Sequence, residues 1–284
     1  MPEVKQITDY KLWDKFVEES PQGTIFSTTS WMRLFDVPFS IHGYYKGDNL
    51  IGGIAGFDSP QPLTPFQGIL VQDLKDAKPP AVISVHNEVA QALMDVVPKE
   101  FYNHYTFPDI RPFKWAGWQC DVRYTYVVNL RDLTKVWADL EKQTRYDINK
   151  LMKDSPIMAY AKDIEDFDEL YEQTFKRKGL GRPVSKEFIK SLFIEMRAEL
   201  LLCYQERRLC SAAMIIKDNK RAYYILGASD RGSTSAYTLW RIFQGLASRS
   251  IGEIDLVGAN TESIALFKRG FGGKLTPYFG VKNA

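Results

Sequence analysis

The sequence predicts an α/β fold in which mixed sheets form two tandem, similarly folded domains. The first observation behind this prediction is the last quarter of the chain, where residues 223–273 read as strand, polar turn, helix, strand, turn and helix. The second is a pair of hairpins with similar sequences. A chain of 284 residues with 45% hydrophobic content is long enough for two medium domains or one large one.

Composition argues against several classes of function. The three cysteines lack a CxxC spacing and the three histidines are scattered, so the sequence predicts neither a disulfide framework nor a metal site. A net charge of +2 does not require a nucleic-acid partner, and we expect no DNA binding. The apolar runs are too short for a membrane span, and the first residues lack the pattern of a secretion signal. We therefore expect a cytoplasmic protein without a membrane span.

The first half begins with helices and a hairpin. Residues Asp9–Val17 show the apolar spacing of an amphipathic helix, and Trp31–Phe35 predicts a second, shorter one. The inward side of the first helix is expected to hold Leu12, Trp13, Phe16 and Val17. Strands Ile41–Tyr45 and Leu50–Phe57 flank the turn residues Lys46-Gly-Asp-Asn49, which predicts a hairpin.

A second hairpin in the later part of the chain matches the first. Strands Leu200–Gln205 and Leu209–Lys217 flank Glu206-Arg-Arg208, and Asp218-Asn-Lys220 leads into a further strand at Tyr223. The two hairpins share a register, which we take as a sign of tandem halves. The matched positions are Tyr45 with Tyr204, Leu50 with Leu209, Gly52-Gly53 with Ser211-Ala212, and Phe57 with Ile216.

The middle of the chain predicts a strand at Tyr124–Leu130 followed by one long helix from Asp132 to about Leu151. A further helix begins at Asp163, and Ser185 is placed to cap the next one. Residues Gly179-Leu-Gly-Arg-Pro183 separate these two helices.

The last quarter combines a polar turn with two strand-to-helix connections. After the Tyr223–Leu226 strand, residues 230–235 are small and polar, and Tyr237–Arg249 shows helical apolar spacing. A buried strand at Ile254–Val257 then turns into a helix, whose inward residues are expected to be Ile264, Phe267 and Phe271. Because the start of a helix leaves backbone N–H groups unpaired at its positive end, such a turn suits a phosphate or pyrophosphate.

Several segments together resemble a known protein family. They are Thr64-Pro-Phe-Gln-Gly-Ile-Leu-Val71, Arg123-Tyr-Thr-Tyr126, Thr144-Arg-Tyr-Asp-Ile-Asn-Lys150, Asp255-Leu-Val-Gly258 and Phe267-Lys-Arg-Gly-Phe-Gly-Gly273. In this order they resemble the FemAB-like, BioF2-like branch of the GNAT superfamily of acyl-CoA N-acyltransferases. The resemblance spans about Thr64 to Tyr278, and its last segment is the most specific.

The resemblance implies two GNAT-like domains, with an acceptor site between them and transfer of an acyl group to an amine. We expect an N-terminal domain at residues 1–122 and a C-terminal domain carrying the transfer site at residues 123–284. Fem-type members take an aminoacyl group from aminoacyl-tRNA to a peptidoglycan precursor in the cell envelope, whereas other relatives use acyl-CoA. The chain departs from the Fem pattern at Gln67-Gly68, where those proteins tend to carry an arginine, and it lacks their long helical hairpin.

Three residues are candidates for catalysis. By analogy with the family, Lys268 supports the carbonyl being transferred; the alternative is a solvated helix lysine beside Arg269. Asp255 ends a strand where such folds place ligands, so it is a candidate to accept the amine proton or orient the acceptor, or it is a carboxylate satisfied by backbone N–H groups. Tyr223 and Tyr224 face opposite ways in their strand, and we select Tyr224 as the candidate proton donor to the leaving atom.

Other residues are candidates for binding the two substrates. Arg145 and Arg177 lie near helix ends and have the two-pronged geometry that grips a diphosphate or a carboxylate, although cations also favour helix C-termini for structural reasons. With Gln67 and Asn260 they form the expected substrate-binding set. The turn expected to take the pyrophosphate of acyl-CoA comprises Arg231, Gly232, Ser233, Thr234 and Ser235, or it is an ordinary capped turn. Thr234 replaces a glycine of the superfamily pattern and would crowd a close backbone approach.

Three hypotheses follow. The preferred one is an N-acyltransferase that uses acyl-CoA as a dissociable co-substrate and a primary amine of a small molecule, amino sugar or peptide as acceptor. The second is an aminoacyl-tRNA-dependent transferase of the Fem type, which predicts a broad basic face and salt-sensitive binding. The third is a catalytically silent tandem-GNAT binding module, in which Lys268 is dispensable.

Overall fold

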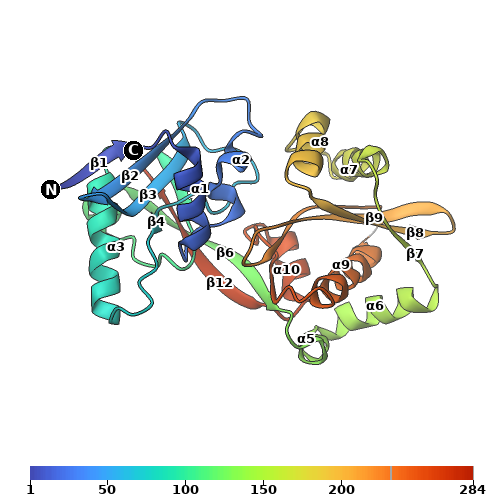
Figure 1. Ribbon diagram of the computed structural model, residues 1–284. Helices are drawn as coiled ribbons and strands as arrows, with labels where there is room; N and C mark the ends of the chain where they lie inside the picture. The colour runs from blue at the N-terminus through green and yellow to red at the C-terminus, as the bar shows by residue number, and fades with distance from the viewer. Residues whose placement is uncertain (231, 284) are drawn as a thin grey trace. The chain divides into compact units, whose positions relative to one another are not determined.

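The protein, examined as a computed structural model, divides into two compact units (Figure 1). The structure describes residues 1–230 and 232–283, without the side chain of Ser233. Unit 1 comprises Met1–Arg123 together with Pro277–Ala284, and unit 2 comprises Tyr124–Thr276. Within the described residues, no helix combines the length and the apolar character that crossing a membrane requires.

Unit 1 is built on an antiparallel sheet with the strand order β1-β2-β3-β4. Its strands are β1 (Pro2–Gln6), β2 (Phe39–Lys46), β3 (Asn49–Phe57) and β4 (Leu70–Val71). Its helical segments are α1 (Tyr10–Glu19), η1 (Ile25–Ser27), α2 (Thr29–Met32), α3 (Pro79–Leu93) and α4 (Arg111–Trp115). A separate strand, β5 (Glu100–Asn103), pairs antiparallel with the end of β12 (Lys274–Lys282).

Two apolar clusters form the core of unit 1. Successive side chains of β2 and β3 point to opposite faces of the sheet. On one face, Ile41 and Ala55 pack in the cluster that contains Trp13 of α1. On the other face, Tyr44 and Ile54 pack in the cluster that contains buried residues of α3. The predicted first helix is therefore present, with Trp13, Phe16 and Val17 buried. Leu12, which was expected to face inward, is 43% exposed, because α1 contacts the sheet along a narrower stripe than expected.

Unit 2 is a mixed sheet with helices on both faces. The strand order is β6-β11-β10-β9-β8-β7, and β10 and β11 are its parallel pair. The strands are β6 (Gln119–Asn129, in unit 2 from Tyr124 on), β7 (Ile157–Tyr160), β8 (Glu199–Gln205), β9 (Arg208–Lys217), β10 (Ala222–Ser229) and β11 (Glu253–Asp255). The helices are α5 (Leu133–Asp139), α6 (Lys142–Lys153), α7 (Glu165–Arg177), α8 (Lys186–Glu195), α9 (Gly232–Ala247) and α10 (Glu262–Arg269).

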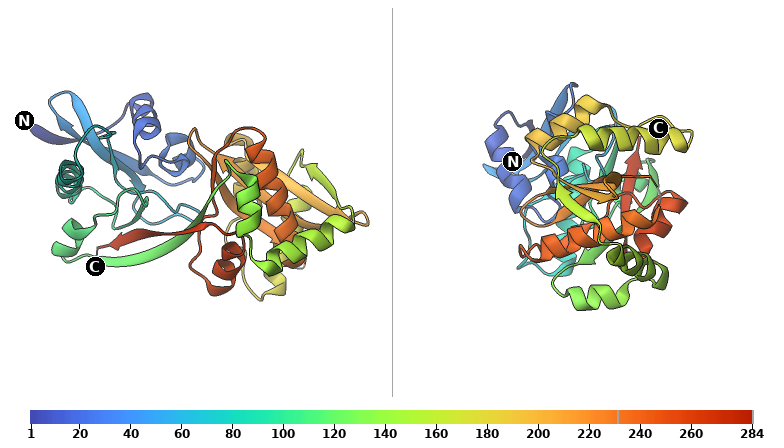
Figure 2. Two further views of the ribbon diagram at one scale, coloured as in Figure 1. Left: turned by 90° about the horizontal axis from the view of Figure 1, so that it is seen from below. Right: turned by 90° about the vertical axis from the view of Figure 1, so that its right-hand side faces the viewer.

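The core of unit 2 lies between the sheet and α9, whose inward residues Leu239, Phe243 and Leu246 are fully buried. Helix α6 lies beside α9 in both views and contributes Ile148 to the same cluster (Figures 1 and 2). Helix α7 packs on the other face of the sheet, against β9 and β10. The Ser185 hydroxyl caps α8 as predicted, by accepting a hydrogen bond from the Phe188 amide at 3.1 Å.

The helix predicted at residues 132–151 is wrong as a single element, because the chain breaks into α5 and α6. Leu140 takes an extended backbone conformation that buries its side chain in the core. The next amide, of Glu141, donates a hydrogen bond of 2.9 Å to the Gly270 carbonyl. Core burial and this long-range bond therefore override local helix propensity.

Four further details differ from the expectations. Helix α9 begins at Gly232 rather than at Tyr237, since small polar residues favour the first turn of a helix as well as a loop. Strand β11 ends at Asp255, and the residues after it turn away. Ile264 is 39% exposed on α10, whereas Phe271 is buried. Finally, residues 277–284, which the sequence assigned to the second domain, group with unit 1 because β12 pairs with β5.

The strand register confirms the predicted match between the two hairpins. Tyr45 pairs with Leu50, and Tyr204 pairs with Leu209, so the positions matched between the two hairpins are also equivalent in their pairing. In each hairpin the register shifts immediately before that tyrosine, between Tyr44 and Tyr45 and between Cys203 and Tyr204. A shared irregularity at equivalent positions supports repeated halves more strongly than the similarity of residues alone.

The turns of the two hairpins differ in how well their residues suit the backbone. Glu206 and Arg207 both have positive φ, at 49° and 65°, where asparagine and glycine are favoured. We expect the double change Glu206→Asn and Arg207→Gly to raise the free energy of unfolding by about 1 kcal/mol in urea denaturation. Gly47 has a φ of 61° and open space around it, so Gly47→Ala should lower the free energy of unfolding by a similar amount. A double variant less stable than wild type would contradict this.

Candidate functional site

The candidate catalytic residues of unit 2 meet where the parallel strands β10 and β11 separate. The two strands pair at Ala222 with Ile254 and at Tyr223 with Asp255. β11 also pairs with β6, and beyond Asp255 the chain stays bonded to β6, because the amides of Leu256 and Ala259 donate to the carbonyls of Tyr126 and Tyr124, each at 2.9 Å. The end of β10 continues with β9 alone.

Asp255 is fully buried at this point. One of its carboxylate oxygens, Oδ1, accepts hydrogen bonds from the Thr125 hydroxyl at 2.5 Å and from the Val257 amide at 2.8 Å. The other, Oδ2, is buried and has no hydrogen-bond partner in the described part of the chain. Burial raises the pKa of Asp255 to about 6, against the opposing effect of the Thr125 hydrogen bond. The site thus holds a carboxylate with one spare acceptor oxygen.

Lys268 approaches from α10 and is only 7% exposed. Its Nζ donates to the carbonyl oxygen of Val257 and, at 3.1 Å, to that of Gly258. Burial lowers the pKa of Lys268 to about 8, and the charge of Asp255 opposes this shift. The alternative interpretation, a solvated helix lysine, is therefore wrong for Lys268. The interpretation as a solvated helix cation applies instead to the neighbouring Arg269, which is exposed and pairs with Glu141 at 2.6 Å.

The segment held by these two charges is strained. Val257 and Gly258 both have left-handed φ angles, 52° and 45°. Between the bonds to Tyr126 and Tyr124 the chain carries one more residue than β6 does, which makes this segment a bulge. A β-branched valine in this conformation costs on the order of 1–2 kcal/mol. Asp255 binds the amide of Val257 and Lys268 binds its carbonyl, so the buried charges compensate for the strain.

Tyr224 completes the group on the β10 side. The Lys268 Nζ lies 5.8 Å from the centre of the Tyr224 ring. Burial raises the pKa of Tyr224 to about 12, so its hydroxyl is protonated at neutral pH. A side chain at Gly227 would collide with this hydroxyl, which explains the glycine. Tyr223 faces the other way and donates to Asp218 at 2.7 Å.

Thr125 is the member of the group that the sequence did not reveal. It lies between two tyrosines in β6, a pattern typical of any half-buried strand. Only the pairing of β6 with β11 brings its hydroxyl to Asp255, 130 positions away in the sequence. Spacing along the chain carries no signal for such a contact.

The turn expected to bind a pyrophosphate leads into the start of α9. Arg231 and the side chain of Ser233 lie outside the described part of the chain. Thr234 is buried, and its hydroxyl donates to the carbonyl of Cys210 at 3.2 Å. Its side chain therefore packs against β9, which removes the reason for expecting it to crowd a ligand. Ser235 is partly buried in the first turn of α9.

The candidate binding residues fall into different surroundings. Arg177, at the end of α7, donates to the carbonyl of Ser229, the last residue of β10, close in sequence to the start of α9. Arg145 donates a hydrogen bond of 3.1 Å to the carbonyl of Ala138, near the C-terminal end of α5. This is the structural role that cations commonly have at helix C-termini. Asn260 accepts from the Tyr124 amide at 2.8 Å. Gln67 belongs to unit 1, where it is buried and donates to the sulfur of Met32.

Comparisons with known proteins agree with this architecture. Residues 138–269 match the family described as Acetyltransferase (GNAT) domain. FemX has a similar structure, with a TM-score of 0.68 and 13% identity, covering 98% of this chain and 96% of that one. L-PGS from Bacillus licheniformis gives 0.58 and 11%, covering 97% and 92%. A tandem GNAT protein from the clavulanic acid biosynthesis pathway gives 0.56 and 9%, covering 99% and 98%. No curated protein sequence matches the chain significantly.

These findings define the class of the protein as an acyltransferase with a tandem GNAT-like α/β fold. Residues 138–269 match the GNAT acetyltransferase domain, and the chain as a whole has the fold of FemX. The predicted resemblance to FemAB-like proteins of the GNAT superfamily is therefore confirmed, as is the predicted fold class.

The lowered pKa of Lys268 predicts a specific pH dependence of stability. Because the folded-state pKa is about 8 and the unfolded value 10.5, the folded protein binds fewer protons than the unfolded chain between these values. The burial penalty is thus present below pH 8 and disappears as the pH rises to 10.5. We expect the unfolding free energy of wild type, relative to Lys268→Met, to rise by on the order of 3 kcal/mol across this window.

The measurement is urea denaturation of both proteins at pH 7.5 to 10.5. Lys153→Met, at an exposed lysine of α6, is the matched control. The unfolding free energy of wild type relative to this variant should stay constant over the same pH range. An equal rise for both comparisons would mean that Lys268 is not the buried ammonium described here.

Proposed function

We propose that the protein is an N-acyltransferase that moves an acyl group from acyl-CoA to a primary amine of a small molecule, an amino sugar or a peptide. The observation that carries this proposal is the group formed by the buried Lys268 and Asp255 and the partly buried Tyr224, at the point where β10 and β11 separate. In open sheets, ligands bind outside the carboxyl ends of parallel strands. Asp255 is the last residue of β11, and Tyr224 follows the last residue of β10 that pairs with β11. The less specific assignment, that the protein is an acyltransferase, is supported by the family match.

The proposed reaction uses each residue for one step. The acceptor nitrogen attacks the thioester carbonyl, a C–N bond forms, and the C–S bond breaks. Lys268 has three N–H donors, of which two are used on Val257 and Gly258, so one remains for the developing oxyanion. The spare oxygen of Asp255 accepts the proton that the amine loses. Tyr224, protonated at neutral pH, supplies a proton to the leaving thiolate.

The donor phosphates are assigned to the start of α9. The first amides of a 16-residue helix form an anion site, and Arg177 lies beside the end of β10 that leads into it. Gly232 to Ser235 supply the amides, and the inward side chain of Thr234 leaves their approach open. Asn260 is retained as an acceptor-binding candidate because it is exposed at the turn after the bulge. The contacts of Arg145 with α5 account for it without a ligand.

A second candidate donor is aminoacyl-tRNA, with a peptidoglycan precursor as acceptor. The similarity of fold to FemX favours this alternative, since Fem-type relatives work in this way. The chemistry at Lys268 would be unchanged, because an ester carbonyl replaces the thioester. The difference lies in the donor, whose binding would weaken steeply as salt concentration rises.

The deciding experiment titrates the protein with acetyl-CoA and with charged tRNA in calorimetry, at 50 and 200 mM salt. The proposal expects saturable binding of acetyl-CoA, weakened about tenfold in Arg177→Gln. Arg207→Gln, at the exposed tip of the β8–β9 hairpin, is the matched control and should bind as wild type does. Salt-sensitive binding of charged tRNA without acetyl-CoA binding would select the alternative donor. Binding of neither would support a silent module.

Removal of the Lys268 ammonium should affect turnover more than folding. We expect Lys268→Ala to lower kcat by about a hundredfold or more, because the oxyanion loses its charged donor. Arg269→Ala removes the adjacent exposed cation and should leave kcat within about twofold. Both are measured with acetyl-CoA and a panel of amines, and thermal unfolding checks that both variants fold. Full turnover of Lys268→Ala would remove this residue from the mechanism.

A further inference from the structure

The hydroxyl of Thr125 has a fixed place beside the Asp255 carboxylate. Strands β11 and β6 pair at Asp255 and Val127, and Thr125 lies two positions from Val127 in β6. Because side chains alternate along a strand, Thr125 projects from the same face of the sheet as Asp255. Its side chain is fully buried, and branching at Cβ restricts its rotation. The direction of the hydroxyl is therefore restricted as well.

This hydroxyl favours the ionised form of Asp255. It donates to Oδ1 at 2.5 Å, and the amide of Val257 donates to the same oxygen at 2.8 Å. A hydrogen bond to a charged acceptor is stronger than one to a neutral acceptor. Burial raises the pKa of Asp255, and the bond from Thr125 opposes this shift because it stabilises the carboxylate.

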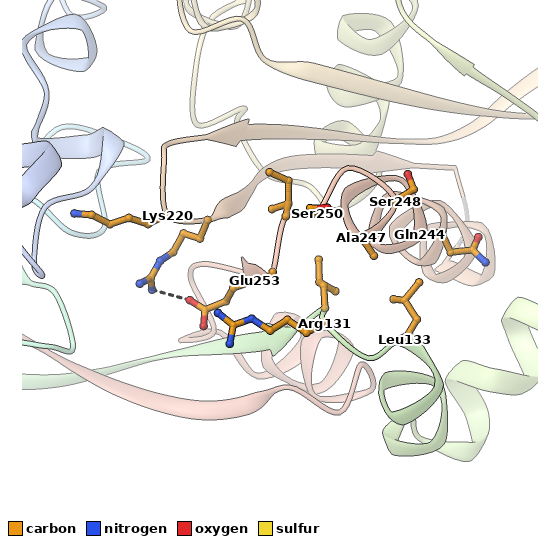
Figure 3. A pocket seen from close by; sticks show the side chains of 12 residues that line it. Arg131, Leu133, Lys220, Gln244, Ala247, Ser248, Ser250 and Glu253 are labelled. Carbon is orange, nitrogen blue, oxygen red and sulfur yellow. Dashed lines mark ion pairs between the residues drawn. The ribbon is translucent and has the colours of Figure 1, made fainter.

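Three other ionisable side chains act on Asp255 from neighbouring elements. Arg221, just before β10, pairs with Glu253 at 3.1 Å, and this pair lines the cavity shown in Figure 3. Tyr223 is the partner of Asp255 in β10, and burial keeps its hydroxyl protonated by raising its pKa. The third is Lys268 of α10. Since Arg221 and Tyr223 keep their charge near neutral pH, Lys268 is the group that titrates together with Asp255.

The charges of Asp255 and Lys268 depend on each other. Burial lowers the pKa of Lys268 to about 8, and the negative charge of Asp255 opposes this shift. Burial raises the pKa of Asp255 to about 6, and the charge of Lys268 is among the effects that oppose it. Both groups are therefore charged between these two values. A change that neutralises Asp255 would also lower the pKa of Lys268, because the ammonium would lose its opposite charge.

We propose that Thr125 is a positioning residue that keeps Asp255 and Lys268 in the charge states that the transfer reaction requires. This inference rests on the proposed function, in which the carboxylate accepts a proton and the ammonium stabilises the oxyanion. Thr125 and the amide of Val257 both bind Oδ1. Oδ2, which has no hydrogen-bond partner in the described part of the chain, is left to accept the proton. The ionised Asp255 in turn keeps Lys268 protonated.

The test compares the pH profiles of kcat for wild type and for Thr125→Val, which lacks the hydroxyl. With acetyl-CoA and an accepted amine at saturating concentrations, wild type should show a bell-shaped profile with limbs at about 6 and about 8. In Thr125→Val the carboxylate loses a donor, so the acidic limb should move up by at least about one pH unit. The alkaline limb should move down. Thr125→Ser keeps the hydroxyl and should restore both limbs.

Thr276→Val is the matched control. Thr276 is buried in β12 and donates to the carbonyl of Lys274 at 3.1 Å, so its substitution should leave both limbs in place. A merely structural role of Thr125 would lower kcat by the same factor at every pH without narrowing the profile, and this result would overturn the proposal. If thermal unfolding shows that Thr125→Val does not fold, Thr125→Ala makes the same comparison.

A measurement without substrates separates this inference from the proposed function. NMR of protein with isotope-labelled aspartate and lysine follows the titration of the Asp255 carboxyl and the Lys268 ammonium directly. In Thr125→Val the pKa of Asp255 should be higher, and that of Lys268 lower, than in wild type. Unchanged values would overturn the inference even if wild type is an active transferase. Shifted values in a protein without turnover would instead overturn the proposed function and leave the control of the two charges standing.

Discussion

The arrangement of unit 2 depends on two buried opposite charges that share one short backbone segment. Asp255 holds the amide of Val257, and Lys268 holds its carbonyl, so each charge has a hydrogen-bonded partner that burial would otherwise deny it. Each charge also offsets part of the cost of burying the other. The same bonds fix the left-handed bulge, which begins where the pairing with β10 ends and that with β6 continues.

Sheet topology explains why this pair is available for chemistry. The side chain of Lys268 comes from α10, Asp255 from β11, Tyr224 from β10 and Thr125 from β6, so four elements supply one group. Such a group is held by rigid elements and lies where two parallel strands stop sharing hydrogen bonds. Preorganised donors of this kind stabilise developing charge more effectively than mobile side chains do.

Much of the fold was readable from the sequence, because periodicity and turn chemistry are local properties. The hairpins, the Ser185 cap and the order of elements after Tyr223 follow from these signals. The break at Leu140 and the contribution of Thr125 could not be predicted, since both depend on partners more than 100 positions away. The burial of Lys268 had no signal in its immediate neighbours: Lys268 and Arg269 are adjacent cations, and the orientation of α10 alone distinguishes them.

The return of β12 to unit 1 has a practical consequence for dissecting the protein. Because residues 277–284 pair with β5, a cut at residues 123 and 124 does not divide the polypeptide into two self-sufficient pieces. The front fragment would expose the hydrogen-bonding edge of β5, and the rear fragment would carry a strand end without its partner. Both are conditions that promote aggregation. A circular permutant that begins at Tyr124 and joins the original termini through a linker would place all residues of unit 1 in one continuous stretch of sequence.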